Sequence, residues 1–266
     1  MIDSIFLLQI VLSFVVGSLW VMITTLLADR FGSKLGGFIG GLPSTAAVSF
    51  FFIGLTQSTQ TAAQATTVFP MSYAFTGLFL VLYALLWHKG FISAFFVSIF
   101  VWFFLSACVV LLDVNNYFLS VVFYIFILIL AVYILEFRLR LPSIGREDIH
   151  YSAFQYLTRA VFGGFIVALA VFLSRIGGPV FGGIFSAFPA VFISVLVINY
   201  RSRGMEFSRA LTKPMLVTGM VSIFIYSVGV RYFYPSLGLW WGTLAAYLFS
   251  MIAALMSYLL IQKKLT

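Results

Sequence analysis

Nine long apolar runs, separated by short polar connections, constrain this chain more than any other feature of its sequence. A helix needs about 20 apolar residues to cross the hydrocarbon of a bilayer. The predicted spans are Ile5–Ala28, Leu35–Thr56, Thr66–Trp87, Phe91–Leu112, Tyr117–Phe137, Phe154–Ser174, Pro179–Tyr200, Ala210–Val230 and Leu237–Ile261. With 63% hydrophobic and 8% charged residues, the chain has too little polar surface for a soluble domain. The sequence therefore predicts an all-α polytopic membrane protein whose surrounding partner is the lipid bilayer.

The basic residues orient the nine predicted spans. Thirteen of the 15 Lys and Arg residues fall on one side of the membrane, and the other side holds only Arg175 and Arg231. Cytoplasmic loops carry the excess of Lys and Arg. We therefore expect a multi-pass protein of the inner (plasma) membrane, with its amino terminus outside and its carboxyl terminus in the cytoplasm. The net charge of +8 then reflects topology, and no nucleic-acid partner is predicted.

An internal repeat links the two halves of the chain. The segment Gly36–Pro43 matches Gly182–Pro189 at an offset of 146, which also pairs Gly17-Ser18 with Gly163-Gly164. After a slip of two residues, Pro70-Met71 matches Pro214-Met215. The alternative is chance similarity, because Gly and Pro are common in membrane helices.

The predicted organisation follows from this repeat. Residues 1–112 form a first repeat of four spans, residues 113–152 a connector with the fifth span and a cytoplasmic loop, and residues 153–266 a second repeat of four spans. Equivalent helices lie five spans apart, and five is odd. Equivalent helices therefore cross in opposite directions, which predicts a 4+1+4 inverted-topology repeat.

Pro43 and Pro189 lie about eight to ten residues into their spans, near mid-membrane, where proline kinks or breaks a helix. The backbone groups freed there must meet protein, water or a ligand, because lipid offers no partner. We therefore predict a solute site between the repeats. Its candidate binding residues are Gly40, Gly41, Pro43, Ser44, Thr45, Ser186, Pro189, Ser194 and Lys213. For Lys213, snorkelling to the cytoplasmic interface is the alternative.

The glycines beside these prolines allow a second interpretation. Gly36, Gly37, Gly182 and Gly183 begin small-xxx-small pairs, which let membrane helices pack closely. Pro70 and Pro214 are expected in the first turns of spans three and eight, where proline is well tolerated. The uncharged outer connector Thr56–Thr67 is interpreted as an exposed loop, with a short polar helix as the alternative.

Ionisable residues exclude several kinds of chemistry. No Asp or Glu falls at the middle of a predicted span, which disfavours proton coupling through a carboxylate. Coupling to sodium through backbone carbonyls, or no coupling, stays open. His88 and His150 lie far apart in sequence, and the single cysteine Cys108 lies in an apolar run. We predict no enzymatic activity, no metal and no cofactor.

The run Gly36–Phe91 combines a glycine-rich start, Pro43, the Phe50–Gly54 stretch, a polar connector and a restart at Thr66–Pro70. With these features it resembles the small GlpM-like inner-membrane proteins, and Gly182–Arg231 resembles them less closely. The resemblance implies two four-span units fused through the fifth span, and a membrane location. It covers the repeats and leaves out the connector.

These features favour a secondary transporter or facilitator of a small solute that works by alternating access around Pro43 and Pro189. A channel of the same architecture is the nearest alternative. A structural or assembly factor and a lipid-handling membrane enzyme are the other classes. The substrate stays open, and so does a possible homo-oligomer.

Overall fold

The computed structural model describes residues 4–30, 41–141 and 151–265, and every regular element within these ranges is helical. The first half contains α1 (Ser4–Arg30), α3 (Thr45–Thr56), α4 (Thr59–Ala65), α5 (Phe69–Leu85), a 3-10 turn (Trp87–Lys89) and α6 (Phe91–Leu111). The connector contains α7 (Tyr117–Tyr133) and a π-helical turn (Ile134–Arg138). The second half contains α8 (Ala153–Gly177), α9 (Pro179–Ser186), α10 (Ala190–Arg203), α11 (Met205–Ala210), α12 (Thr212–Pro214), a π-helical turn (Met215–Gly219) and α13 (Met220–Leu265).

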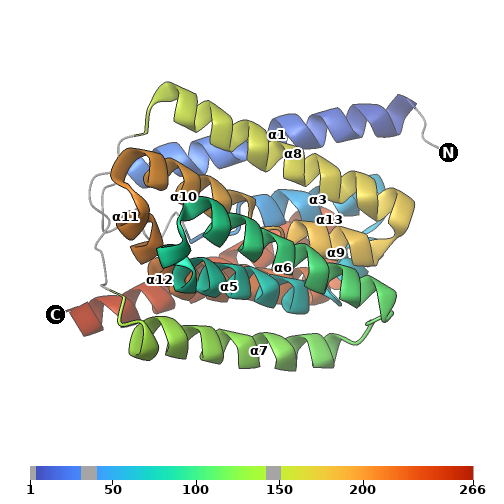
Figure 1. Ribbon diagram of the computed structural model, residues 1–266. Coiled ribbons are helices and arrows are strands. Elements are labelled where there is room, and N and C mark those ends of the chain that lie inside the picture. Colours follow the sequence, from blue (N-terminus) through green and yellow to red (C-terminus); the bar gives the residue numbers. More distant parts are fainter. Residues whose placement is uncertain (1–3, 31–40, 142–150, 266) are drawn as a thin grey trace.

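The described helices confirm a multi-pass, all-α membrane protein. Six of them are long and apolar enough to cross a bilayer, or up to seven if α4 and α5, which meet at a bend of 45°, form one span. The helices run roughly along one direction, with α7 at one edge of the bundle and α1 and α8 at the opposite edge (Figure 1). The first residue of α1 and the last residue of α13 lie at opposite ends of the bundle (Figure 1).

The long helix α13 is a helical hairpin. Gly238 has a φ of 74°, a value that ordinary side chains rarely adopt, and it interrupts the helical backbone. The rings of Tyr226 and Tyr247 lie 6.1 Å apart, and those of Phe233 and Phe249 lie 6.2 Å apart. In one straight helix, residues 21 positions apart would be separated by about 30 Å. The two arms of α13 therefore pack side by side in opposite directions.

Helices α1 and α8 also pack antiparallel. At one end of the pair, the Tyr156 hydroxyl donates a hydrogen bond to Asp29 at 2.5 Å. At the other end, the Arg175 guanidinium lies 5.6 Å from the centre of the Phe6 ring. The end of α1 thus meets the beginning of α8, and the beginning of α1 meets the end of α8.

Small residues bring α1 and α8 together at the centre of this pair. A Cβ atom on Gly164 would lie 2.1 Å from the Ser18 hydroxyl oxygen and 2.5 Å from the Phe14 carbonyl oxygen. A Cβ atom on Gly17 would lie 3.1 Å from Val167, and one on Gly163 would lie 2.8 Å from Val21. Close approach of backbones at small residues is the usual packing of membrane helices.

The segment Thr56–Thr67 differs from the expected exposed loop. Residues Thr59–Ala65 form helix α4, and the Ser58 side chain caps it by accepting from the Thr61 N–H at 3.0 Å. The alanines of α4 face inward and are buried. A Cβ atom on Gly183 of α9 would lie 2.1 Å from the Ala65 carbonyl oxygen, so α9 packs directly on the α4 backbone. Tertiary contact with α9 therefore makes this polar segment a packed helix.

Candidate functional site

Two helices begin inside the bundle, each after a break. Helix α9 ends at Ser186, and α10 begins at Ala190, directly after Pro189. Helix α3 begins at Thr45, after the non-helical stretch from Gly41 to Ser44 that contains Pro43. Proline removes a backbone donor and displaces the carbonyl in the preceding turn, which accounts for both starting points.

A hydroxyl from the first half binds the carbonyl freed at the second break. The Thr76 hydroxyl of α5 donates to the Ala187 carbonyl oxygen at 2.8 Å. The Trp102 indole of α6 donates to the Thr76 hydroxyl oxygen at 3.2 Å. The Trp102 ring also packs edge-on against Phe188, with centroids 5.0 Å apart. A buried carbonyl without a partner would be costly, and Thr76 removes that cost.

A hydroxyl from the second half binds the carbonyl freed at the first break. The Ser222 hydroxyl of α13 donates to the Gly41 carbonyl oxygen. The same hydroxyl lies 3.3 Å from the carbonyl oxygen of Gly219, in the π-helical turn before α13. Thr76 and Ser222 are both fully buried, so water does not compete for these bonds.

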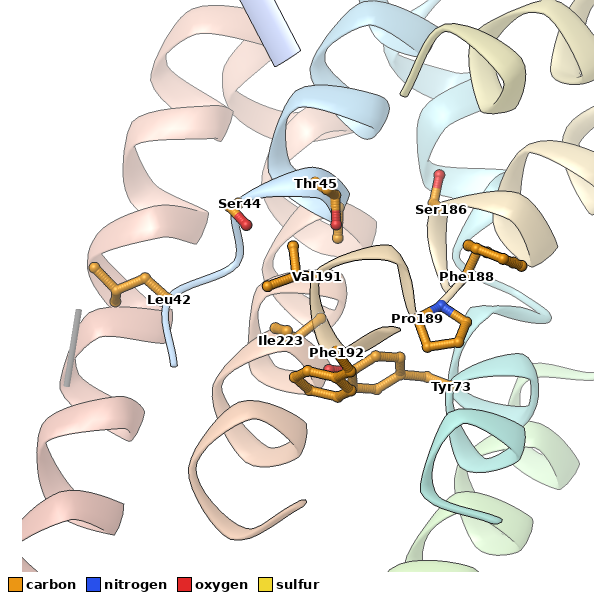
Figure 2. A pocket seen from close by; sticks show the side chains of 11 residues that line it. Leu42, Ser44, Thr45, Tyr73, Ser186, Phe188, Pro189, Val191, Phe192 and Ile223 are labelled. Atoms are coloured by element: carbon orange, nitrogen blue, oxygen red, sulfur yellow. The ribbon is translucent and has the colours of Figure 1, made fainter. Parts of the chain in front are cut away.

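A pocket lies between the two breaks. Figure 2 shows that its walls come from the first turn of α3, the α9–α10 break, α5 and α13. The lining residues are Leu42, Ser44, Thr45, Ala46, Tyr73, Ser186, Phe188, Pro189, Val191, Phe192 and Ile223. Its volume of about 30 Å³ holds one or two water molecules and leaves no room for a metabolite. A larger solute would therefore need a conformation in which this pocket is wider.

The lining is mostly apolar and carries no charge. Among the residues that the structure describes, it contains hydroxyls from Ser44, Thr45, Tyr73 and Ser186 and no Asp, Glu, His, Lys or Arg. The Tyr73 hydroxyl points to the Gly219 carbonyl oxygen at the long distance of 3.5 Å. Within the described ranges, no group of three or more His, Cys, Asp or Glu side chains could hold a metal ion. The pocket thus offers hydrogen bonds and apolar contact.

Four of the predicted binding residues meet at this pocket, namely Ser44, Thr45, Ser186 and Pro189. Pro43 is buried between two lining residues, and Gly41 contributes the carbonyl that Ser222 binds. Gly40, and with it the predicted packing residues Gly36 and Gly37, lies outside the described residues.

Two other predicted binding residues lie elsewhere. Ser194 is half-buried in α10, and its hydroxyl donates to the Val191 carbonyl oxygen at 2.7 Å. The Lys213 ammonium lies 2.6 Å from the Glu136 carboxylate and donates to the Leu141 carbonyl oxygen at 3.2 Å. Lys213 is therefore neutralised by the segment after α7, and it does not belong to the described lining of the pocket.

The predicted packing residues are close to neighbouring helices. A Cβ atom on Gly182 would lie 2.7 Å from Ser174, and Gly183 meets the Ala65 backbone as described above. Pro70 lies in the first turn of α5, as expected for helix initiation. Pro214 ends α12 and directly precedes the π-helical turn Met215–Gly219, so it lies at an irregular point of its span.

Residue-by-residue reasoning missed the side chains that hold the two breaks, which are Thr76, Trp102 and Ser222. They are uncharged and lie in apolar runs, where hydroxyls usually bond within their own helix. The repeat offset was the available signal, because Thr76 and Ser222 are 146 residues apart, as are Gly41 and Ala187, although the match of Pro70 with Pro214 has an offset of 144.

Comparison with known proteins gives one family match. No curated protein and no solved structure matches the chain. One family model matches it twice, over residues 10–116 and again over residues 156–263. The two matches begin 146 residues apart and together cover most of the chain. The chain therefore belongs to DUF3147, a family of proteins of unknown function.

Proposed function

We propose that this protein is a secondary transporter or facilitator that moves a small solute across the inner membrane by alternating access. The observation that carries the proposal is the pocket at which two broken helices from different halves of the chain meet. Breaking a helix inside a bilayer exposes backbone groups that lipid does not satisfy. In transporters, paired breaks of this kind form solute sites between repeats.

The lengths of α3 and α10 support a pocket at mid-membrane. Helix α3 has 12 residues and α10 has 14, and both begin at the pocket. At 1.5 Å per residue, they extend for roughly 18 and 21 Å. Each length is close to half the thickness of a bilayer including its interfaces. A solute in the pocket is therefore about equally far from both surfaces.

Reciprocal hydrogen bonds support a two-fold relation between the halves. Thr76 binds the carbonyl of Ala187, and Ser222 binds the carbonyl of Gly41. Thr76 and Ser222 are 146 residues apart, and so are Gly41 and Ala187, so the second bond repeats the first with donor and acceptor exchanged between the halves. A self-complementary contact of this kind is what a two-fold axis produces.

The contact between α1 and α8 supports an axis in the membrane plane. Gly17 approaches Val167, and Gly163 approaches Val21, which are equivalent contacts at the same offset. The two helices are antiparallel, so a two-fold axis that exchanges them must run perpendicular to both. For helices that cross the bilayer, such an axis lies in the membrane plane and relates halves of opposite orientation. The inverted 4+1+4 repeat rests on these contacts.

Nine spans are the count that fits this symmetry. Each arm of the α13 hairpin serves as one span, and α9 with α10 forms another across the break. Helix α3 belongs to span two, and α4 with α5 forms span three. An odd number of crossings places the ends of the chain on opposite sides. The distribution of Lys and Arg then puts the carboxyl terminus in the cytoplasm.

The symmetry suggests how access alternates. Inverted halves exchange conformations when the site opens to the other side. The pocket described here is too small for a solute, and Phe188, Phe192 and Tyr73 help to close it. Opening requires one break to move relative to the other. Such a movement stretches or replaces the hydrogen bonds from the Thr76 hydroxyl to Ala187 and from the Ser222 hydroxyl to Gly41. The resemblance to GlpM-like proteins remains a prediction about ancestry.

Flux into liposomes tests the proposal. Purified protein is reconstituted, and uptake of urea, glycerol, sodium formate and sodium chloride is followed by stopped-flow light scattering. We expect saturable flux of at least one of these solutes. The variant Val191→Trp fills the pocket and should lower that flux to the level of protein-free liposomes. The matched control is Val122→Trp, because Val122 lies on the exposed face of α7 and its substitution should leave flux unchanged.

Other results would point to other classes. Flux that never saturates would favour a channel with this architecture. Equal loss of flux in Val191→Trp and Val122→Trp would show that the pocket is not the route. A structural or assembly factor predicts no flux above background, together with a change in the yield of a membrane complex when Pro43→Ala is introduced.

A further inference from the structure

Both halves of the chain line the pocket with residues at equivalent positions. Three positions at or just before the start of α3 have counterparts 146 residues later that line the same pocket, and the pairs are Leu42 with Phe188, Thr45 with Val191, and Ala46 with Phe192. The repeat therefore builds the pocket from two walls, a first-half wall around Thr45 and a second-half wall around Val191 (Figure 2). Because the walls correspond, their side chains can be compared position by position.

The first-half wall carries hydroxyl groups. Ser44 and Thr45 follow each other at the start of α3, and both line the pocket. The Ser44 hydroxyl makes no capping bond to its own helix. The Tyr73 hydroxyl of α5, also in the first half, lies 3.5 Å from the Gly219 carbonyl oxygen, which is longer than the roughly 2.7 to 2.8 Å of a strong hydroxyl bond. Since a hydroxyl can both donate and accept, this wall offers hydrogen bonds to a solute.

The second-half wall is apolar at the corresponding positions. Ala190 stands where the first half has Ser44, and Val191 stands where it has Thr45. The aromatic side chains of Phe188 and Phe192 also line this wall. Ser186 belongs to the lining as well, but its hydroxyl oxygen is enclosed by protein and points away from the pocket (Figure 2). This wall therefore offers apolar contact.

Neither wall compensates a charge. An ion that leaves water needs an opposite charge or several strong ligands in return. Among the residues that the structure describes, the lining contains no Asp, Glu, His, Lys or Arg. The carbonyls described at the breaks, which are the ligands that a sodium ion would need, already accept from Ser222 and Thr76. The lining therefore favours an uncharged solute.

From the difference between the walls we infer that the pocket binds a small uncharged solute with a polar end and a short apolar part, such as a short-chain primary amide. The polar end lies against Ser44 and Thr45, and the apolar part lies against Val191 and Phe192. The inference rests on the proposed function, since it names the class of solute for the same site. The volume of about 30 Å³ keeps the solute small, because each further heavy atom requires more widening of the pocket.

Acetamide and urea are the matched pair of probes. They have nearly the same shape, but acetamide has a methyl group where urea has a second amide nitrogen. Uptake into proteoliposomes is measured over a range of concentrations, and uptake by protein-free liposomes is subtracted. The wild type should reach half-saturation at about ten-fold lower acetamide than urea, because the second amide of urea would meet the apolar wall without a hydrogen-bond partner. Saturation-transfer NMR of the acetamide methyl group measures binding without transport.

Two isosteric substitutions exchange the character of the walls. Thr45 and Val191 are both half-buried and have the same shape, so Thr45→Val and Val191→Thr should fold like the wild type. Thr45→Val removes a hydroxyl and should weaken acetamide binding by about five-fold, as expected for the loss of one hydrogen bond. The matched control is Thr158→Val, because the Thr158 hydroxyl is exposed on α8 and donates to the Phe154 carbonyl oxygen of its own helix. This control should leave the uptake of both solutes unchanged.

The reverse substitution gives the opposite change. Val191→Thr places a hydroxyl on the apolar wall, where it can bind the second amide of urea. It should strengthen urea binding by about five-fold and bring its half-saturation closer to that of acetamide. The double variant with both substitutions again has one hydroxyl and one valine at these two positions. It should therefore recover the preference for acetamide.

Two results would overturn the inference and leave the transport proposal intact. One is half-saturation of the wild type at equal concentrations of acetamide and urea. The other is saturable flux of chloride or formate that Val191→Trp abolishes, since the solute would then be an ion. Conversely, saturation transfer to acetamide that Thr45→Val weakens and Thr158→Val does not, without flux in liposomes, would support the solute class and contradict transport. The two proposals therefore fail separately.

Discussion

The break before α3 and the break before α10 use the same backbone arrangement with different side chains. In both, a carbonyl before the proline accepts a hydrogen bond from a hydroxyl of the other half. The first break is followed by Ser44 and Thr45, whereas the second is followed by Ala190 and Val191. Both halves of the repeat therefore stabilise their break in the same way. The side chains that each break contributes to the pocket wall differ.

The two hydroxyls that bind the freed carbonyls, those of Thr76 and Ser222, also differ in their own hydrogen-bond partners. Thr76 is itself held by the Trp102 indole, whose ring packs against Phe188 of the second break. Ser222 shares its hydroxyl between the carbonyls of Gly41 and Gly219. Among the residues that the structure describes, Thr76 and Trp102 thus anchor the second break, and Ser222 anchors the first.

The largest effect should come from the α1–α8 contact, where the halves also differ. Ser18 of the first half corresponds to Gly164 of the second, and a methyl group on Gly164 would meet the Phe14 carbonyl oxygen at 2.5 Å. Gly164→Ala should lower the free energy of unfolding by about 3 kcal/mol, because α1 must move away. Gly17→Ala meets Val167 at 3.1 Å and should cost about 1 kcal/mol. Unfolding in mixed micelles with increasing SDS measures both, and equal costs would contradict this difference between the halves.

The next largest effect on the free energy of unfolding should come from the hydroxyls of Thr76 and Ser222, which bind the carbonyls freed at the breaks. Thr76→Val keeps the shape of the side chain but leaves the Ala187 carbonyl and the Trp102 N–H without a partner. It should lower the free energy of unfolding by about 2 to 3 kcal/mol. Ser222→Ala leaves the Gly41 carbonyl without this donor and should cost about 1 kcal/mol. The same unfolding titration compares them, with Thr76→Ser as the control that should restore most of the stability.

The smallest effect should come from the indole. Trp102→Phe removes the bond to the Thr76 oxygen while Thr76 still donates to Ala187. The expected loss is about 0.5 to 1 kcal/mol, within the range of membrane hydrogen bonds. In a double-mutant cycle with Thr76→Val, the two losses should not add, because both variants break the same chain of bonds. Additive losses would mean that Trp102 stabilises the fold through packing alone.

Much of the architecture was predictable from local physics. The apolar runs predicted an all-helical membrane protein, and α3 and α10 start within two residues of the two prolines predicted to break the helices. Of the predicted binding residues, Ser44, Thr45, Ser186 and Pro189 line one pocket. Each of these predictions depends on a property of the residue itself or of the bilayer around it.

Other features depend on partners that are distant in sequence. The polar segment Thr56–Thr67 contains helix α4 because Gly183 of α9 packs on its backbone. The polar composition of this segment does not indicate that contact. Lys213 forms an ion pair with Glu136, a residue 77 positions earlier in the chain. The role of Tyr73 in the pocket was missed because its counterpart in the second half is Gly219, so the repeat does not mark it.

The sequence by itself determined that this chain lies in a membrane, where its helices break and that its halves correspond at an offset of 146, because hydrophobicity and the missing N–H of proline act locally. Only the tertiary structure decided which groups serve the breaks. Thr76 reaches a carbonyl 111 residues away and Ser222 one that is 181 residues away. The physical reason is that a carbonyl freed inside a bilayer needs a donor, and which donor arrives depends on how the two halves pack.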